Sequence, residues 1–413
     1  MEEKLRFVFE YELGERTMSE LCQRYEIARE TGYVWLRRYR HAGVAGLVEH
    51  SRAAHRHSNQ TPENIERMVL ELRQAHMRWG PRKLQWVLQR DQPGRRWPAA
   101  STIGALLQRA GLVVARKKRW RTAPYSEPLA HADEANRVWC ADFKGWFRTA
   151  DGQRIDPLTI SDARSRYLLR CQTVERTDTA RVQAIFEAAF REYGMPQAIR
   201  TDNGPPFASR AVAGLSRLAV WWIKLGIVPE RIAAGHPEQN GRHERMHRTL
   251  QQEAAQPPAA NPREQQRTLD RFRQEFNELR PHEALEMQTP AAIYQPSARQ
   301  FPASLPEPDY PKGMLVRSVR PHGHFRWKKD DIFLSEVLWG ERVGLWPEDD
   351  RWFTIYFAQL PLARFDSRKL QVTPLPKISS IAEGLAGEED PSPSPAPHSR
   401  IEPDQKVSDM CPV

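Results

Sequence analysis

Three acidic side chains stand where carboxylates could hold divalent metal ions between them. Asp142 lies inside an apolar stretch, residues 138–146, that predicts a strand. Asp202 follows a short apolar run and precedes an Asn-Gly pair, so we expect it at the end of a strand. Glu244 falls in the first turns of an expected helix. Because magnesium prefers oxygen ligands, three acids on three elements predict a pocket for divalent metal.

Each acid also has an ordinary structural interpretation. Asp142 could be an edge-strand acid, because a carboxylate in a central strand is costly unless it is paired or bound to metal. Asp202 could form an Asx-turn with the residues that follow it. Glu244 could be a surface acid that pairs with Arg248, one helical turn later. The metal-site hypothesis depends on all three acids acting together.

The segment that carries the acids predicts a mixture of strands and helices. The expected elements are strands at 138–148, 155–162 and 167–174, a helix capped by Thr177 or Asp178 and ended by Gly194, a strand at 198–201, a helix near 209–218 and the helix of Glu244. This order places two of the acids on strands and the third on a helix.

Length and composition favour a multidomain protein of a reducing compartment. The chain has 413 residues, which predicts two to four domains. Its four cysteines show neither zinc-ligand spacing nor a disulfide framework, so we interpret them as reduced thiols. No apolar run approaches the ~18 residues of a membrane span, and the acidic N-terminus is unlike a secretory signal. These features predict a cytoplasmic protein.

The positive charge of the chain is concentrated in one segment. The formal net charge is +10. Residues 51–121 carry 16 basic and 4 acidic side chains, a balance of +12, whereas the segments on either side are nearly neutral. Such clustering is typical of a surface for nucleic acid. The alternative is a basic helical domain that is merely soluble.

Residues 1–55 predict a helix-turn-helix domain. Thr17 and Glu20 form a capping-box pattern at the start of one helix. A second helix is expected at 29–39 and could enter a major groove. The DNA-binding candidates on and beside it are Arg29, Arg37, Arg38 and Arg40. The segment has no excess charge, which argues against strong binding on its own.

Residues 60–121 predict a second helix-turn-helix domain followed by a basic tether. Thr61 and Pro62 mark the start of its first helix, and Ser101 is expected to cap its third helix, which Gly111 ends. We expect the third helix to read DNA. The DNA-binding candidates are Ser101, Thr102 and Arg109 in that helix, and Arg116, Lys117, Lys118, Arg119 and Arg121 in the tether. The tether could follow a phosphate backbone or be a solvated linker.

The C-terminal third changes character twice. Residues 262–297 predict a helical connector. Residues 308–373 turn to short strands, expected near 314–319, 332–334, 343–346 and 352–357, and predict a small β domain. Residues 374–413 are rich in Pro, Ser and acids, a composition that predicts disorder.

Several stretches in a fixed order carry a resemblance to a known family. They are the Asp142 strand, residues 201–207, residues 237–245, and residues 276–285 followed by Thr289-Pro290. Together they resemble the RNase H-like catalytic core of DDE transposases and retroviral-type integrases, with the segment that follows it. Within that group the chain is similar to an insertion-sequence transposase of the IS481 type, close to the IS3 group, over residues 5–296.

The resemblance implies the fold and the metal ions. The fold class is multidomain α+β, with N-terminal helix-turn-helix domains, an RNase H-like α/β core at 135–257 and a small C-terminal SH3-like β-barrel. Two Mg²⁺ or Mn²⁺ ions per active site are implied, with Asp142 bridging both and Asp202 and Glu244 each completing one site. Lys144, Arg245 and Arg248 are the DNA-binding candidates of the core; Lys144 could instead only cover the sheet edge.

The resemblance also implies the reaction and the partners. The enzyme would cut the 3′ ends of its element, and the freed hydroxyls would attack target DNA. Its partners would be double-stranded DNA, both element ends and target, and further copies of itself, at least a dimer, because two ends must be held together. No membrane and no nucleotide cofactor are expected, since the chain has no P-loop and transesterification exchanges one phosphodiester for another. The expected location is the bacterial nucleoid.

Two glutamates compete for the role of third acid. Thirty-five residues separate Asp202 from Glu238, the spacing of the D,D-35-E pattern, whereas forty-one separate it from Glu244. Motif context favours Glu244, because it follows Gly241 by three residues as the family's glutamate follows a glycine. The extra residues fit an insertion around residues 219–225.

Two other functions stay open at this point. The chain could be an inactive or domesticated DNA-binding regulator, although all three acids are present. It could also be an RNase H-like nuclease or resolvase, although two expected DNA-reading domains precede the core.

Overall fold

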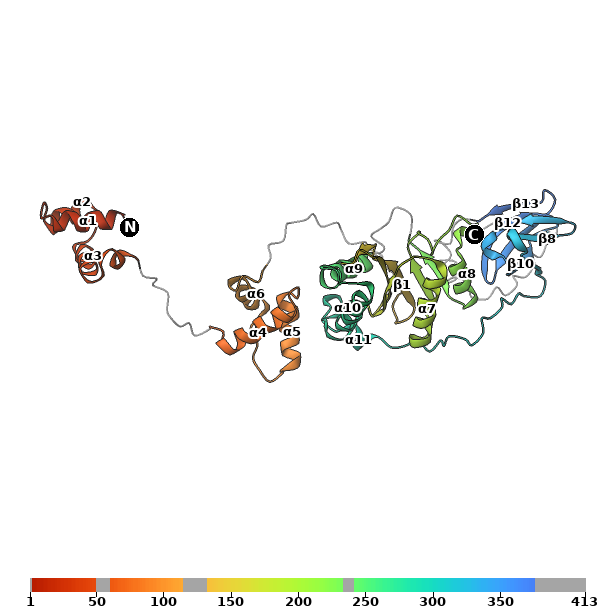
Figure 1. Ribbon diagram of the computed structural model, residues 1–413, viewed down its shortest axis with the longest axis horizontal. Coiled ribbons are helices and arrows are strands. Elements are labelled where there is room, and N and C mark those ends of the chain that lie inside the picture. Colours follow the sequence, from red (N-terminus) through yellow and green to blue (C-terminus); the bar gives the residue numbers. More distant parts are fainter. Residues whose placement is uncertain (1, 50–59, 114–131, 233–240, 376–413) are drawn as a thin grey trace, which may run out of the picture. The chain divides into compact units, whose positions relative to one another are not determined.

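The computed structural model describes residues 2–49, 60–113, 132–232 and 241–375 (Figure 1). The chain divides into two compact units, residues 1–71 and 72–413. None of the helices in the described ranges is long and apolar enough to cross a membrane.

The first unit contains a three-helix domain. Its helices are α1 (Glu2–Glu12), α2 (Met18–Arg24) and α3 (Arg29–Ala42). The expected capping box is present: the amide of Thr17 donates to Oε2 of Glu20 at 2.8 Å, and the amide of Glu20 donates to Oγ1 of Thr17. Phe7 is fully buried and meets Tyr25 and Trp35 edge to face. The helix-turn-helix predicted from the sequence therefore forms around an aromatic centre.

The next helices are α4 (Glu63–Ala75), α5 (Pro81–Asp91) and α6 (Ala100–Arg109). α4 begins one residue later than Pro62, whose carbonyl accepts from the amide of Glu66. The prediction that Ser101 caps α6 is wrong. Ala99 holds the extended capping conformation and makes no side-chain cap, so Ser101 lies inside the first turn. Gly111 follows the helix with a positive φ of 70°, as expected of a helix end.

The core is a mixed six-stranded sheet. Its strands are β1 (Val138–Phe143), β2 (Phe147–Arg148), β3 (Arg154–Asp162), β4 (Leu168–Val174), β5 (Ala198–Thr201) and β6 (Val228–Arg231). The order is β2-β3-β1-β5-β6, with β4 also paired to β3. β1, β3 and β4 pair antiparallel, whereas β5 and β6 run parallel to β1. The strand expected at 138–148 is split into β1 and β2, and Gly145 between them has a φ of +91°.

Helices cover both faces of this sheet (Figure 1). α7 (Thr179–Tyr193) and α8 (Arg217–Lys224) pack on one face, where Trp139 of β1 meets Phe190 of α7. α9 (Gly241–Glu253) and α10 (Pro262–Gln274) pack on the other, where Cys171 of β4 joins a cluster with Leu250. Residues that alternate along the strands therefore serve two separate cores.

One expectation for the core is wrong. The helix expected near 209–218 begins only at Arg217, because the Ser216 hydroxyl caps α8 by accepting from the amide of Ala219 at 3.1 Å. Residues 219–225 form the rest of α8 and its end, and Trp222 there is fully buried, so the suggested insertion stays a prediction. Strand β6, which closes that side of the sheet, was not predicted at all.

The connector packs directly on the core. After α10 the chain makes a π-helical turn at Glu275–Leu279, and α11 (Pro290–Ile293) follows. Asn277 in that turn accepts from the amide of Leu168 at 2.8 Å and donates to its carbonyl at 3.0 Å. The side chain of Asn277 thus continues the hydrogen bonding of edge strand β4.

The C-terminal part is antiparallel β structure. Its strands are β7 (Leu315–Ser318), β8 (His324–Trp327), β9 (Asp330–Phe333), β10 (Arg342–Pro347), β11 (Trp352–Phe357), β12 (Leu360–Asp366) and β13 (Gln371–Pro374). Five form a sheet in the order β13-β12-β11-β10-β7, and β8 and β9 form a hairpin whose strands contact β7 and β13, the two end strands. The predicted β domain is confirmed, although β8, β12 and β13 were missed. The expected disordered tail lies almost wholly outside the described residues.

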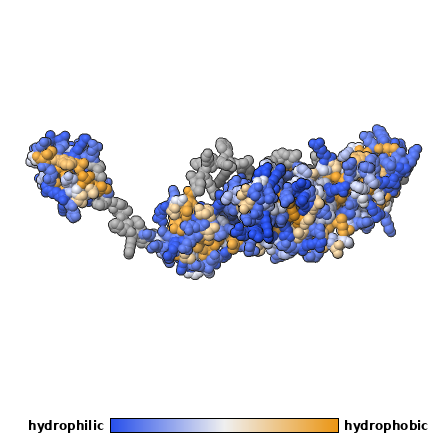
Figure 2. All heavy atoms as spheres, viewed as in Figure 1, coloured by the Kyte–Doolittle hydropathy of each residue, from blue (hydrophilic) through white to orange (hydrophobic). Residues whose placement is uncertain are grey.

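Short 3₁₀ turns connect some of these helices and strands. They lie at Gly43–Leu47, Val212–Gly214, Glu283–Leu285, Pro321–Gly323 and Glu336–Leu338. On the face shown in Figure 2, hydrophilic residues cover much of the surface over the core.

Candidate active site

Asp142 and Asp202 come at the same end of two neighbouring parallel strands of the core sheet. The parallel register of β1 and β5 pairs Cys140 with Arg200. Two residues beyond this pair stand Asp142 on β1 and Asp202 directly after β5. Neighbouring strands are about 4.8 Å apart, and residues in register point to the same face. The two carboxylates therefore start from adjacent backbone positions.

Asp202 carries an oxygen that lacks a protein partner. Its Oδ1 is buried and makes no hydrogen bond with any residue that the structure describes. Burial raises the pKa of the Asp202 carboxyl, and the hydrogen bond from the Gly204 amide opposes this only in part. A buried carboxylate oxygen without a donor is costly unless a cation meets it. The unsatisfied oxygen and the hard oxygen donors at this end of the two strands fit a magnesium ion.

A threonine hydroxyl fastens helix α9 over these acids. Thr159 pairs with Asp142 across the β1–β3 ladder, and its Oγ1 lies 3.0 Å from the carbonyl oxygen of Asp142. The same Oγ1 lies 2.6 Å from Nε2 of His243 and 2.7 Å from Nε2 of His247. The hydroxyl has one hydrogen, which it donates to the carbonyl, so we assign both imidazoles as Nε2–H donors. Their Nδ1 atoms are then acceptors.

Burial keeps both rings neutral. It lowers the pKa of His243 to about 4. Burial, followed by the charges of His243 and Lys144, lowers the pKa of His247 to about 2. Nδ1 of His247 lies 4.0 Å from Oδ2 of Asp142. Two acceptors facing each other at this distance favour a donor or a cation between them.

Neither histidine was predicted to have a role from the sequence. The available signal was their spacing, because residues four apart on a helix share a face. The role of Thr159 could not be predicted, because a threonine within an apolar strand is common and the local sequence does not show which distant residues it contacts.

Glu244 lies on α9 one turn before His247 and is exposed. No three His, Cys, Asp or Glu side chains within the described residues come close enough together to hold one metal ion. The grouping of Glu244 with the two aspartates therefore stays a prediction. Its competitor, Glu238, lies outside the described residues.

The basic candidates of the core come from the end of β1 and from α9. Lys144 directly follows β1; burial lowers its pKa, while the carboxylates of Asp156 and Asp142 act to raise it. Arg245 and Arg248 are exposed on α9. Lys144 is thus close enough to Asp142 for their charges to interact.

Comparison with known proteins gives the family of the chain. Residues 132–237 and 225–290 match two family models that are both described as an integrase core domain. The chain is 30% identical over 273 residues to the insertion element IS476 uncharacterized 39.2 kDa protein of Xanthomonas euvesicatoria, covering 65% of this chain and 75% of that protein. The chain belongs to the insertion-element transposases that carry an integrase core.

The transposase has further similar proteins. It is 29% identical over 251 residues to the insertion element IS407 uncharacterized 31.7 kDa protein of Burkholderia multivorans, which covers 60% of this chain and 86% of that protein. Among solved structures it matches the HTLV-2 integrase catalytic core domain in complex with magnesium, at 16% identity and a TM-score of 0.32, over 39% of this chain and 98% of that one.

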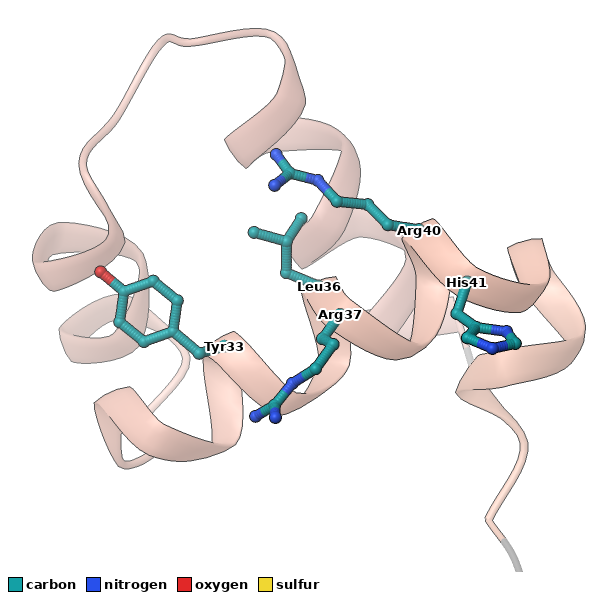
Figure 3. A pocket seen from close by; sticks show the side chains of 5 residues that line it. All are labelled: Tyr33, Leu36, Arg37, Arg40 and His41. Atoms are coloured by element: carbon teal, nitrogen blue, oxygen red, sulfur yellow. The ribbon is translucent and has the colours of Figure 1, made fainter.

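The N-terminal part of the transposase matches DNA-binding families. Residues 3–55 match a helix-turn-helix domain and residues 31–107 a homeodomain-like domain. On α3, the candidates Arg29, Arg37, Arg38 and Arg40 are all exposed. The Nε of Arg40 donates to Glu12 at 2.9 Å. Figure 3 shows that Arg37 and Arg40, three residues apart on α3, send their guanidinium groups in different directions.

The remaining candidates of the transposase lie on α6 and after it. Ser101, Thr102 and Arg109 are exposed on α6, while Ile103 and Leu107 of the same helix are buried. α6 therefore turns a polar face outward, as a groove-reading helix must. The tether residues Arg116, Lys117, Lys118, Arg119 and Arg121 lie outside the described residues.

Proposed function

We propose that this transposase is of the IS481 type and cuts and joins DNA at the terminal inverted repeats of its own element. Asp142, Asp202 and Glu244 would hold two Mg²⁺ ions. The single observation that carries the proposal is the parallel pairing of β1 with β5, since Asp142 and Asp202 come at the same end of these two strands. The unsatisfied Oδ1 of Asp202 adds support, because a cation is what such an oxygen lacks.

Glu244 would join the two aspartates from helix α9. The hydrogen bonds of His243 and His247 to Thr159 fasten this helix to the strand beside Asp142. Uncompensated carboxylates repel one another, so the three acids would approach only when cations are present.

The chemistry is two successive displacements at phosphorus. Bound metal would activate the attacking oxygen and neutralise the leaving oxygen. In the first step a water oxygen attacks the phosphorus at the element end, the P–O3′ bond breaks, and the released 3′-oxygen takes a proton. In the second step that 3′-hydroxyl attacks a phosphodiester of target DNA and displaces another 3′-oxygen. One phosphodiester is exchanged for another, so no nucleotide is consumed.

The N-terminal helices would select the DNA. α3 and α6 would read the inverted repeats through exposed faces that carry Arg37, Arg38, Ser101 and Arg109. Both ends must be cut and joined in concert, so the active form would contain at least two copies of the chain in the bacterial nucleoid.

A cleavage and joining assay with a duplex that carries the element end tests the proposal. We expect Mg²⁺-dependent cleavage and joining, both abolished by Asp142→Asn, Asp202→Asn and Glu244→Gln. Glu238→Gln is the matched control and should keep activity. A fully active Glu244→Gln protein with an inactive Glu238→Gln protein would reverse the assignment of the third acid.

The same assay separates the alternative functions. Binding of the end without cleavage would indicate a DNA-binding regulator. Cleavage with no preference for the end and no joining would indicate a nuclease or resolvase.

A further inference from the structure

A basic cavity lies beside α9, and none of the three acids of the proposed metal site lines it. It has a volume of 310 Å³, at the lower end of ligand-sized sites. Its wall comes from the β3–β4 turn, from α9, from the loop around His282 and from the start of α5. Six cations line it: Arg78, Lys83, Arg166, Arg242, Arg245 and Arg280.

The cavity and the acids lie on different flanks of α9. A helix turns about 100° per residue. Arg242, Arg245 and Thr249 therefore share the flank that lines the cavity. Glu244 points from a different flank, roughly 130° around the helix from the mean direction of those three. None of the three acids lines the cavity, although His243, which contacts Thr159 beside Asp142, does.

Acidic groups do not neutralise this wall. Among the residues that the structure describes, Asp162 and Glu283 are the only acids that line the cavity together with the six cations. Asp162 is buried, and its carboxylate already accepts three hydrogen bonds. Two come from Ser165, from the amide at 2.7 Å and from the hydroxyl at 2.6 Å, and one comes from the amide of Asn136 at 2.7 Å. Of the cations, Arg280 is paired with Glu253 through contacts of 2.7 and 2.8 Å. A net positive charge remains.

Two nitrogens in the wall lack partners. Nε of Arg166 and Nε2 of His282 are buried and make no hydrogen bond with the described residues. The guanidinium Nε always carries a hydrogen, so Arg166 presents an unused donor. His282 is 9% exposed and packs edge to face on Phe276. A hydrogen-bond donor without a partner, in a positively charged wall, favours a bound anion that can accept the hydrogen bond.

The cations of the wall oppose one another. Burial, and then the positive charge of Arg280, lowers the pKa of Lys83 to about 8. Burial, and then Arg242 and Arg245, lowers the pKa of Arg166. An anion in the cavity would relieve this repulsion, and a phosphate group would provide several acceptor oxygens for the arginines.

We propose that this cavity binds a phosphate group of the DNA backbone, as a contact separate from the three acids and from the N-terminal helices. The inference rests on the proposed function for the identity of the anion, since that function brings DNA to this core. The contact would hold a DNA duplex on the flank of α9 that lines the cavity, while the three acids cut DNA on the flank that carries Glu244.

Fluorescence anisotropy with a labelled duplex of arbitrary sequence, without Mg²⁺, tests the proposal over a range of salt concentrations. Arg245→Gln is the first variant, because Arg245 is exposed and Gln suits a helix. Arg166→Gln combined with it is the second. Arg263→Gln, at the exposed start of α10, removes the same charge elsewhere and is the control.

The double variant should flatten the plot of log affinity against log salt by about 2, because each lost phosphate contact removes about 0.9 from the slope. Arg245→Gln should remove about half of that. Arg263→Gln should leave the slope at the wild-type value. A double variant with the slope of the control overturns the proposal.

Inorganic pyrophosphate distinguishes DNA from a free phosphate ligand. It should compete with the duplex for the wild-type protein and much less for the double variant. If pyrophosphate raises the melting temperature of the wild type but not of the double variant, while both bind DNA equally, the cavity serves a free phosphate compound and the DNA assignment is overturned. Because neither assay needs cleavage, a failure here is separate from a failure of the joining assay.

Discussion

Nδ1 of His247 lies 4.0 Å from Oδ2 of Asp142, while its Nε2 contacts the Thr159 hydroxyl at 2.7 Å. The ring therefore bridges the strand pair of the proposed site and the helix that carries Glu244. Sequence motifs pointed to the acids, but this contact explains how α9 is held near them.

Removing the Thr159 hydroxyl should loosen α9. In Thr159→Val, Nε2 of His243 and Nε2 of His247 lose their buried partner, and each unsatisfied group costs about 1–3 kcal/mol. We expect the free energy of unfolding of the core to fall by about 2 kcal/mol or more, measured by urea denaturation, with DNA cleavage reduced as well. Thr173→Val on β4 is the control. Equal stability of the two variants would show that the hydroxyl does not fasten the helix.

Neutralising Asp202 should stabilise the fold while removing activity. Its Oδ1 is buried without a partner, so the charged carboxylate opposes folding when no cation is bound. We expect Asp202→Asn to raise the melting temperature in EDTA and to abolish cleavage. Mg²⁺ should raise the melting temperature of the wild type but not that of the variant.

Asp178→Ala is the control, and we expect it to lower stability without affecting cleavage, the opposite of Asp202→Asn. Asp178 caps α7 by accepting from the amide of Arg181 at 3.0 Å. Its loss should cost about 1 kcal/mol of stability and leave cleavage intact. A less stable Asp202→Asn protein would argue against a site prepared for a cation.

His282 should make the stability of the core depend on pH. Burial, and then Lys83, lowers its pKa from 6.5 to about 3. Between these values the unfolded chain binds a proton that the folded chain does not, so stability is lost as pH falls from 6.5 towards 3. Above pH 7 this contribution is constant.

In His282→Gln the dependence of the unfolding free energy on pH should be shallower across that window, as measured by denaturation at several pH values. His322→Asn, an exposed site with a positive φ that Asn accepts, is the control. Parallel curves for wild type and His282→Gln would contradict the prediction.

Arg37 should matter more for DNA binding than Arg40. Arg37 is exposed on α3, and its guanidinium points away from that of Arg40, which is tied to Glu12 (Figure 3). We expect Arg37→Gln to weaken binding to the element end several-fold in an anisotropy titration, with a smaller effect for Arg40→Gln, because the Arg40 side chain is already paired. The reverse ranking would contradict the prediction and give Arg40 the larger share of the DNA contact.

Local patterns along the sequence predicted much of the fold and the proposed acids. The capping box of Thr17, the end of β5 at Asp202 and the helix of Glu244 each depend on residues only a few positions apart, so a single stretch contains the signal. The start of α8 was misplaced because the Ser216 cap was not recognised, and β6 was missed because Val228–Arg231 has no alternating pattern.

The tertiary structure decided what depends on distant residues. Thr159 meets His243 and His247 across 84 and 88 positions, and the Asp142–Asp202 neighbourhood depends on the pairing of β1 with β5. The basic cavity likewise gathers arginines from the β3–β4 turn, α9 and the loop after α10. Such contacts are set by packing and strand register, and no periodicity within one stretch records them. The sequence therefore determined which chemical groups this transposase carries, and folding decided which of them meet.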